Sequence, residues 1–192
     1  MDDIILFGPT RSARSALKIA LKSEFQVTEL GTLNWLLGIQ IECHSDSVTL
    51  SQQAYIDKLL SRFGMTSCNP VTLPSDPNSK LRKFQDGDNI ADATLYQQKI
   101  GSLIYLVIGT CPDLAFTVSL LSQYSSQPTN IHMGPAKRIL QYIKGTRDKF
   151  LTDTKCSALS LAGFADADFA NDKDDRKSIS GHIFQLAMNT IS

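Results

Sequence analysis

Residues 94–146 constrain the fold more than any other stretch, because they predict three consecutive helices. The first has one apolar face, made by residues that recur at steps of three and four: Leu95, Ile100, Leu103, Ile104, Val107 and Ile108. It is predicted to end before Pro112, which suits the first turn of the second helix because proline has no N–H to donate. The second helix is apolar almost all round and is predicted to be buried between its neighbours. The third is predicted to end at Lys144 and Gly145, a basic last turn with a glycine cap.

The stretches on either side of these helices supply mixed secondary structure. Ile4–Phe7 predicts a short strand, and residues 11–25 predict a helix. Asn34–Cys43 alternates like a strand with one apolar face, and residues 35–50 predict a β-hairpin followed by a helix that ends at Gly64. Ala158–Phe164 and Gly181–Leu186 predict two strands joined by a charged loop. The fold class is therefore α+β rather than a regular βαβ array.

Four segments are predicted along the chain. Residues 1–66 hold the first strand, helix, hairpin and helix. Residues 67–92 are rich in proline, aspartate, asparagine and serine and predict a linker. Residues 93–150 hold the three helices, and residues 151–192 hold the final hairpin. Both ends of the chain are expected to lie within structure rather than at a domain edge.

Composition narrows the class of protein. The 192 residues carry 19 basic and 19 acidic side chains, so any attraction for nucleic acid must be local. Four cysteines lie far apart with no C-x-x-C pair, which favours reduced thiols over a disulfide or zinc site. No apolar run is long enough to predict a membrane span.

Acidic side chains form two candidate metal sites. Asp2 and Asp3 precede the first predicted strand, and Asp166 and Asp168 alternate along a later one. Such carboxylates could share Mg²⁺, which prefers oxygen ligands. The residues alone favour a solvated chain end for Asp2 and Asp3. For Asp166 and Asp168 they slightly favour a solvent-facing strand edge.

Basic side chains gather on and after the third helix: Lys137, Arg138, Lys144, Arg147 and Lys149. A row of this kind can follow a phosphate backbone. A solvated helix face explains it equally well, so both interpretations stay open.

Several ordered motifs resemble the Pol polyprotein of copia-type LTR retrotransposons. Met1–Gly8 resembles the end of the reverse transcriptase palm motif, and Trp35–Ile41 (WLLGIQI) resembles the hairpin called the primer grip. Further matches are Ile100–Leu106 (IGSLIYL), Pro112–Phe116 (PDLAF), Ala136–Thr146 (AKRILQYIKGT) and Gly163–Ala170 (GFADADFA). The last of these resembles the opening of the family's ribonuclease H domain.

This resemblance implies a division of the chain and a set of site residues. It implies a palm remnant with primer grip and thumb start, a connection-like helical segment, and an incomplete ribonuclease H-like hairpin. Asp2, Asp3 and Asp166 would be catalytic, Mg²⁺-binding carboxylates. Trp35, Gly38, Lys137, Arg138 and Lys144 would contact an RNA or DNA template–primer.

The resemblance also implies what this stretch lacks. The fingers, the palm strand with the other metal-binding aspartate and the remaining ribonuclease H acids have no counterpart here, and Cys111 stands where the family usually has arginine. We therefore expect a fragment of an RNA-directed DNA polymerase with ribonuclease H, inactive as an isolated chain. The alternatives are a nucleic-acid-binding remnant and a relic without selected function. The parent activity implies an intracellular location, in the cytoplasm or nucleus.

Overall fold

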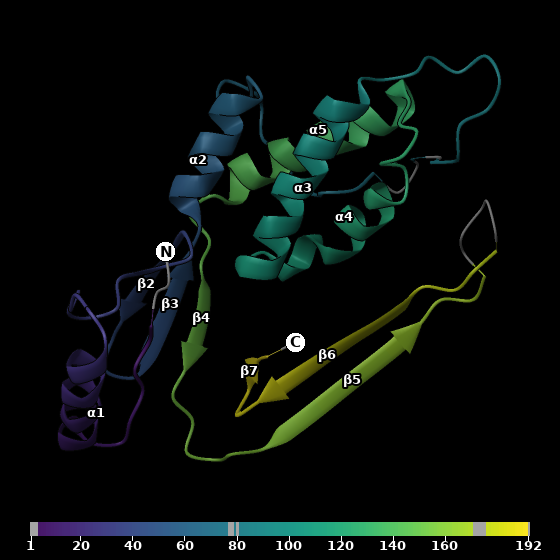
Figure 1. Ribbon diagram of the computed structural model, residues 1–192. Coiled ribbons are helices and arrows are strands. Elements are labelled where there is room, and N and C mark those ends of the chain that lie inside the picture. The colour runs from purple at the N-terminus through teal and green to yellow at the C-terminus, as the bar shows by residue number, and fades with distance from the viewer. Residues whose placement is uncertain (1–3, 77–78, 80, 171–175, 192) are drawn as a thin grey trace.

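The computed structural model describes residues 4–76, 79, 81–170 and 176–191 (Figure 1). Within these residues the fold is mixed, with five α-helices and two antiparallel sheets. The helices are α1 (Arg11–Glu24), α2 (Gln53–Arg62), α3 (Ala93–Gly109), α4 (Ala115–Ser122) and α5 (Asn130–Thr146), with the 3₁₀ turn η1 (Pro112–Leu114) before α4. The strands are β1 (Trp35–Leu36), β2 (Ile39–Cys43), β3 (Ser47–Ser51), β4 (Leu151–Thr154), β5 (Leu161–Ala167), β6 (Ser180–Leu186) and β7 (Asn189–Thr190).

The hydrophobic core lies between helices α2, α3, α4 and α5. Its buried members come from all four helices and from η1, and they include Leu59, Leu103, Leu114, Leu121 and Ile139. Tyr96 is also buried, and its hydroxyl donates to the Leu121 carbonyl at 2.8 Å, which satisfies the polar tip of the side chain. The helices predicted from apolar spacing therefore form one packed unit.

The first sheet has the strand order β1-β2-β3-β4. Chain neighbours β2 and β3 pair with Ile41 opposite Leu50, and β3 then pairs with β4 so that Leu50 lies opposite Leu151. The second pairing joins residues about 100 positions apart, because β4 follows α5 in the chain.

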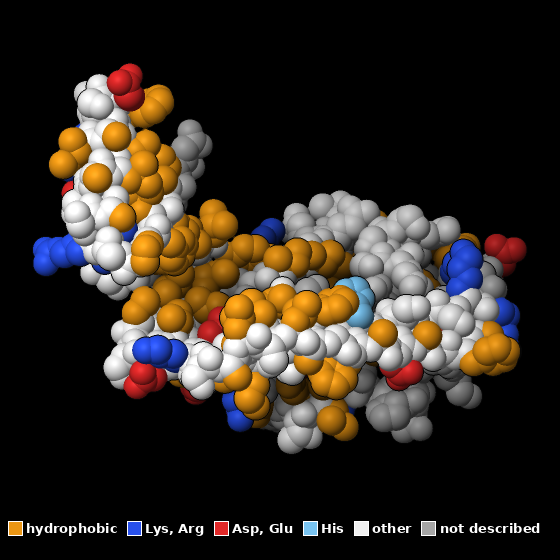
Figure 2. All heavy atoms as spheres, turned by 90° about the horizontal axis from the view of Figure 1, so that it is seen from below, with side chains coloured by type: hydrophobic (Ala, Val, Ile, Leu, Met, Phe, Trp, Pro, Cys, Tyr) orange, Lys and Arg blue, Asp and Glu red, His pale blue; other side chains and the backbone are white. Residues whose placement is uncertain are grey.

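The second sheet is the long hairpin β5-β6 with the short strand β7. Asn189 connects it to the first sheet, because its side-chain amide accepts from the Thr154 N–H at 2.7 Å and donates to the Thr154 carbonyl at 2.9 Å. Figure 2 shows hydrophobic side chains gathered on the face seen from below. The exposed large apolar residues of this part of the chain include Leu161, Phe164, Phe169, Ile183, Phe184 and Met188.

Helix α1 lies beside the first sheet, away from the helical core (Figure 1). Thr10 caps its start by accepting from the Ala13 N–H at 3.2 Å. It contains no buried residue, so its apolar side chains Leu17 and Ile19 are exposed.

Three sequence expectations about strands are corrected. Ile4–Phe7 is not a strand, because none of the described ladders pairs with it and a strand needs a hydrogen-bonded neighbour. Asn34–Cys43 is not one strand, since a two-residue turn at Leu37 and Gly38 divides it into β1 and β2. The strand expected at Ala158–Phe164 is shifted to Leu161–Ala167, in register with β6.

Two expectations about helices are corrected as well. The third helix continues through Gly145 to Thr146, and Gly145 allows close approach of the linker: a Cβ at this position would lie 3.1 Å from Pro70 Cβ. The second helix is not buried all round, because Phe116 is 53% exposed while Val118 is buried. The four-segment division of the chain stays a prediction.

Candidate nucleic-acid interface

The turn between β1 and β2 forms the tip of the hairpin that carries Trp35 and Gly38. Leu37 and Gly38 both have positive φ, at 49° and 79°, the conformation of a two-residue turn whose twist suits a hairpin. This conformation is costly for Leu37, since a left-handed residue with a Cβ is unfavourable by about 1–2 kcal/mol. Trp35 and Leu37 are 55% and 74% exposed, so the tip presents two large apolar side chains to solvent.

Tyr105 of α3 holds this hairpin tip in place through a hydrogen bond. Its hydroxyl donates to the Leu37 carbonyl. A Cβ added to Gly38 would lie 2.7 Å from the Tyr105 hydroxyl oxygen. The ring of Tyr105 in turn packs edge-on against Tyr55 of α2, with centroids 4.6 Å apart. The hairpin tip is therefore exposed but held by the helical core, and Gly38 is required both for its φ and for the close approach of Tyr105. Sequence spacing gave no signal for this contact, which joins residues 68 positions apart.

A second feature is a cluster of cations around Phe63, at the end of α2. The Arg62 guanidinium carbon and the Lys99 ammonium nitrogen each lie 5.5 Å from the centroid of the Phe63 ring. Partial burial lowers the pKa of Lys99, and the charge of Lys137 on α5 lowers it further. Among the described residues, Arg62, Lys99 and Lys137 have no acidic side chain within 4 Å. Three helices thus bring together positive charge that is not neutralised locally.

The other predicted basic contacts, Arg138 and Lys144, hold the linker in place. Arg138 Nε donates to the Leu73 carbonyl at 3.1 Å, and Lys144 Nζ donates to the Cys68 carbonyl at 2.5 Å. Both side chains are partly buried by these contacts. Their predicted contact with nucleic acid stays a prediction, and of the three predicted helix cations only Lys137 is exposed.

The two aspartates at the end of β5 have different surroundings. Asp166 lies opposite Gly181 in the ladder, and its Oδ1 accepts from the Ala167 N–H at 2.8 Å. Asp168 follows the last residue of the strand, and its Oδ1 accepts from the Ile179 N–H at 2.6 Å. The carboxylate of Asp168 is thus engaged in holding the hairpin together, whereas Asp166 is exposed.

The described residues do not make a metal site by themselves. Within them, no group of three His, Cys, Asp or Glu side chains is placed to hold an ion. Asp2 and Asp3 lie outside the described residues, and Asp166 offers a single carboxylate. A magnesium site for phosphoryl transfer needs further oxygen ligands.

Comparison with known proteins gives consistent matches along the chain. Residues 1–77 match the model of the reverse transcriptase (RNA-dependent DNA polymerase) family. The whole chain is 37% identical to the retrovirus-related Pol polyprotein from transposon RE1 of Arabidopsis thaliana and 33% identical over 200 aligned residues to that from transposon TNT 1-94 of Nicotiana tabacum. It is also 33% identical over its full length to an uncharacterized mitochondrial protein of Arabidopsis thaliana, of which it covers 79%. The chain belongs to the reverse transcriptase family of copia-type retrotransposon Pol polyproteins.

The match covers the whole of this chain but only a part of each Pol polyprotein. The chain spans 13% of the RE1 Pol polyprotein and 15% of the TNT 1-94 one, so it corresponds to a part of those proteins. No solved structure matches it. Within its described part, no helix combines the length and hydropathy that a membrane crossing requires.

Proposed function

We propose that this reverse transcriptase segment holds a template–primer duplex and does not catalyse synthesis on its own. The observation that carries the proposal is the exposed hairpin tip, held by Tyr105 on the same helix that brings Lys99 to the cation cluster. Tyr105 and Lys99 are six residues apart, which separates them by about 9 Å along α3. An apolar tip and a cationic cluster at this separation suit a primer end and the adjoining phosphates.

Each part would contribute a different kind of contact. Trp35 offers a flat aromatic surface on which a base or sugar can stack, and such stacking is worth roughly 1–3 kcal/mol per base. Arg62 and Lys99, which lie over the Phe63 ring, and Lys137, whose charge acts on Lys99, would bind phosphates and release counterions from the duplex. Gly38 contributes indirectly, because it allows the turn that presents Trp35 and Leu37.

The proposed division of the chain follows the family resemblance. Residues 1–66 would be a palm remnant with the primer grip and thumb start, residues 93–150 a connection-like helical segment, and residues 151–192 the opening of a ribonuclease H-like domain. In the longer polyprotein, Asp2, Asp3 and Asp166 would be ligands of Mg²⁺, which supplies Lewis-acid stabilisation of phosphoryl transfer. The carboxylates that complete both sites would come from other parts of that polyprotein.

Primer extension with the purified chain tests the catalytic half of this proposal. We expect no Mg²⁺-dependent incorporation of deoxynucleotides on an RNA template with a DNA primer. Extension of the primer would refute it.

Fluorescence anisotropy with the same labelled template–primer tests the binding half. The chain should bind at low salt, and Tyr105→Phe should weaken binding because it releases the Leu37 carbonyl while keeping the ring against Tyr55. Lys155→Ala, which removes one exposed charge elsewhere, is the control and should retain wild-type affinity. Equal affinity of Tyr105→Phe and the wild type would show that the held hairpin tip does not contact the duplex.

A further inference from the structure

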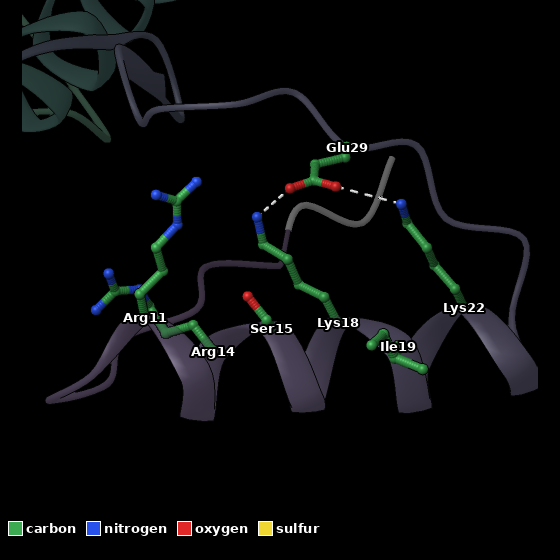
Figure 3. Close-up of a pocket in the computed structure, with 7 residues that line it drawn as sticks. All are labelled: Arg11, Arg14, Ser15, Lys18, Ile19, Lys22 and Glu29. Atoms are coloured by element: carbon green, nitrogen blue, oxygen red, sulfur yellow. Dashed lines mark hydrogen bonds and ion pairs between the residues drawn. The ribbon is translucent and has the colours of Figure 1, made fainter.

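Helix α1 carries a row of four cations that has no part in the interface described above. Arg11, Arg14, Lys18 and Lys22 follow one another at steps of three, four and four residues. At 3.6 residues per turn, these steps keep all four side chains within about 80° around the helix axis, over a length of about 16 Å. They line one groove with Glu29, which lies in the segment after the helix (Figure 3).

The carboxylate of Glu29 neutralises only one end of this row. It binds Lys18 and also Lys22, whose Nζ lies 3.2 Å from Glu29 Oε2. The hydrogen bond from Lys18 and then that from Lys22 hold the pKa of Glu29 below its usual value. Figure 3 shows Arg11 and Arg14 extending from the start of the helix without a link to Glu29. Arg14 Nη1 donates to the Gly8 carbonyl at 2.5 Å, and no described acidic side chain pairs with either arginine.

Helix stability does not account for this placement. Cations in the first turn oppose the helix dipole, and the first turn of α1 contains no acidic residue. Four cations and one carboxylate give the groove a net charge of plus three in a chain whose total charge is zero. Arg11 and Arg14 thus place positive charge where it opposes the helix dipole, whereas Lys22 lies in the last turn, where a cation favours it.

We propose that the Arg11–Arg14–Lys18–Lys22 face of α1 binds the phosphate backbone of a nucleic-acid strand, as a second contact separate from the hairpin and the Phe63 cluster. This inference rests on the proposed function, since it assumes that the chain binds nucleic acid. A row of about 16 Å spans roughly five phosphates of one duplex strand at 3.4 Å of axial rise per phosphate. The contact is sequence-independent, because only phosphate groups are engaged. Glu29 acts as an internal competitor that phosphates displace from Lys18 and Lys22.

Arg11→Ala/Arg14→Ala tests the proposal by fluorescence anisotropy across a NaCl series. Each phosphate contact contributes about 0.9 to the slope of log K against log salt, and hence about eightfold in affinity at about 0.1 M salt. Loss of both contacts should reduce the slope by about 1.8 and the affinity by about 60-fold. Because alanine favours helix formation, α1 should persist, which circular dichroism checks. Arg11→Lys/Arg14→Lys keeps the charge and should restore most of the binding, whereas Lys155→Ala/Arg176→Ala removes equal charge from exposed sites elsewhere and should leave it unchanged.

Glu29→Gln provides a test in the opposite direction. Removal of the competing carboxylate frees Lys18 and Lys22, so binding should tighten and the salt slope should steepen. Binding to a single strand and to an RNA–DNA hybrid of the same length shows which form of nucleic acid supplies the phosphates. The proposal is supported if binding to either one is weakened by Arg11→Ala/Arg14→Ala and tightened by Glu29→Gln.

The outcomes that overturn the inference are distinct from failure of the proposed function. If the wild type binds and Arg11→Ala/Arg14→Ala binds equally well with the same slope, the α1 contact is refuted and the proposed function stands. Failure of the wild type to bind at low salt removes both. If the chain binds a poly-glutamate peptide of matched charge as tightly as it binds the nucleic acid, the assignment to phosphate is overturned.

Discussion

His132→Ala should destabilise the helical core, because this side chain makes three separate contacts in a fully buried place. His132 Nδ1 accepts from the Thr129 N–H at 2.9 Å, which completes the cap of α5. Since Nδ1 accepts, the ring proton is on Nε2, which donates to the Arg82 carbonyl at 3.0 Å and ties the linker to the helix. The ring also stacks on Tyr124, with centroids 4.2 Å apart and planes 15° from parallel.

The magnitude follows from these contacts. Loss of the reciprocal capping-box bond to the Thr129 N–H costs about 1 kcal/mol, loss of the bond to Arg82 about 1 kcal/mol, and loss of the stacked ring pair about 1 kcal/mol. The free energy of unfolding should therefore fall by roughly 3 kcal/mol, a large part of the 5–15 kcal/mol typical of a domain. The cavity left by the ring acts in the same direction.

Urea unfolding followed by circular dichroism measures this loss, with His132→Gln as the matched control. A glutamine at this position of a capping box can still accept from the N–H of Thr129, but it loses the aromatic stack. We expect the stability of His132→Gln to lie between those of the wild type and His132→Ala. A loss below about 1 kcal/mol for His132→Ala would refute the reasoning, since either hydrogen bond alone accounts for that amount.

Two further substitutions give independent tests. Gly38→Ala should destabilise the chain by about 1–2 kcal/mol in urea unfolding, because alanine is strained at this positive φ and its Cβ would displace Tyr105; unchanged stability would contradict the turn. Arg82 holds the pKa of Asp88 at about 2, below the usual 3.8, so the stability that this carboxylate contributes is present above pH 3.8 and is lost as the pH falls towards 2. Asp88→Asn should flatten the decline in thermal midpoint over that pH range, and an equal decline in both proteins would contradict the pairing.

The helices could be predicted from sequence more fully than the strands. Apolar spacing indicated α1, α2 and the three later helices, because an amphipathic helix is specified by its own residues. Strands depend on partners that can lie far along the chain. No local pattern indicated that β4 would pair with β3, and Ile4–Phe7 had the composition of a strand without a described neighbour.

The candidate interface, too, could be predicted from sequence only in part. Trp35 and Gly38 were identified by resemblance, but the stretch WLLGIQI alternates like one strand and hides its turn. Such turns are usually marked by Asn-Gly or Asp-Gly, and Leu37 at positive φ carries no such mark. The roles of Tyr105, Phe63 and Lys99 depend on how α2 and α3 pack, which spacing within either helix does not reveal.

The most direct test of the central claim is the salt dependence of template–primer binding by the wild type and by Lys99→Ala/Lys137→Ala, measured by fluorescence anisotropy. We predict that the wild type binds at low salt and that log K falls linearly with log salt. Loss of the two cations should reduce the slope by about 1.8, whereas Lys155→Ala/Arg176→Ala, which removes two exposed cations elsewhere, should leave it unchanged. Absence of wild-type binding at low salt, or equal slopes for the wild type and Lys99→Ala/Lys137→Ala, would contradict the account.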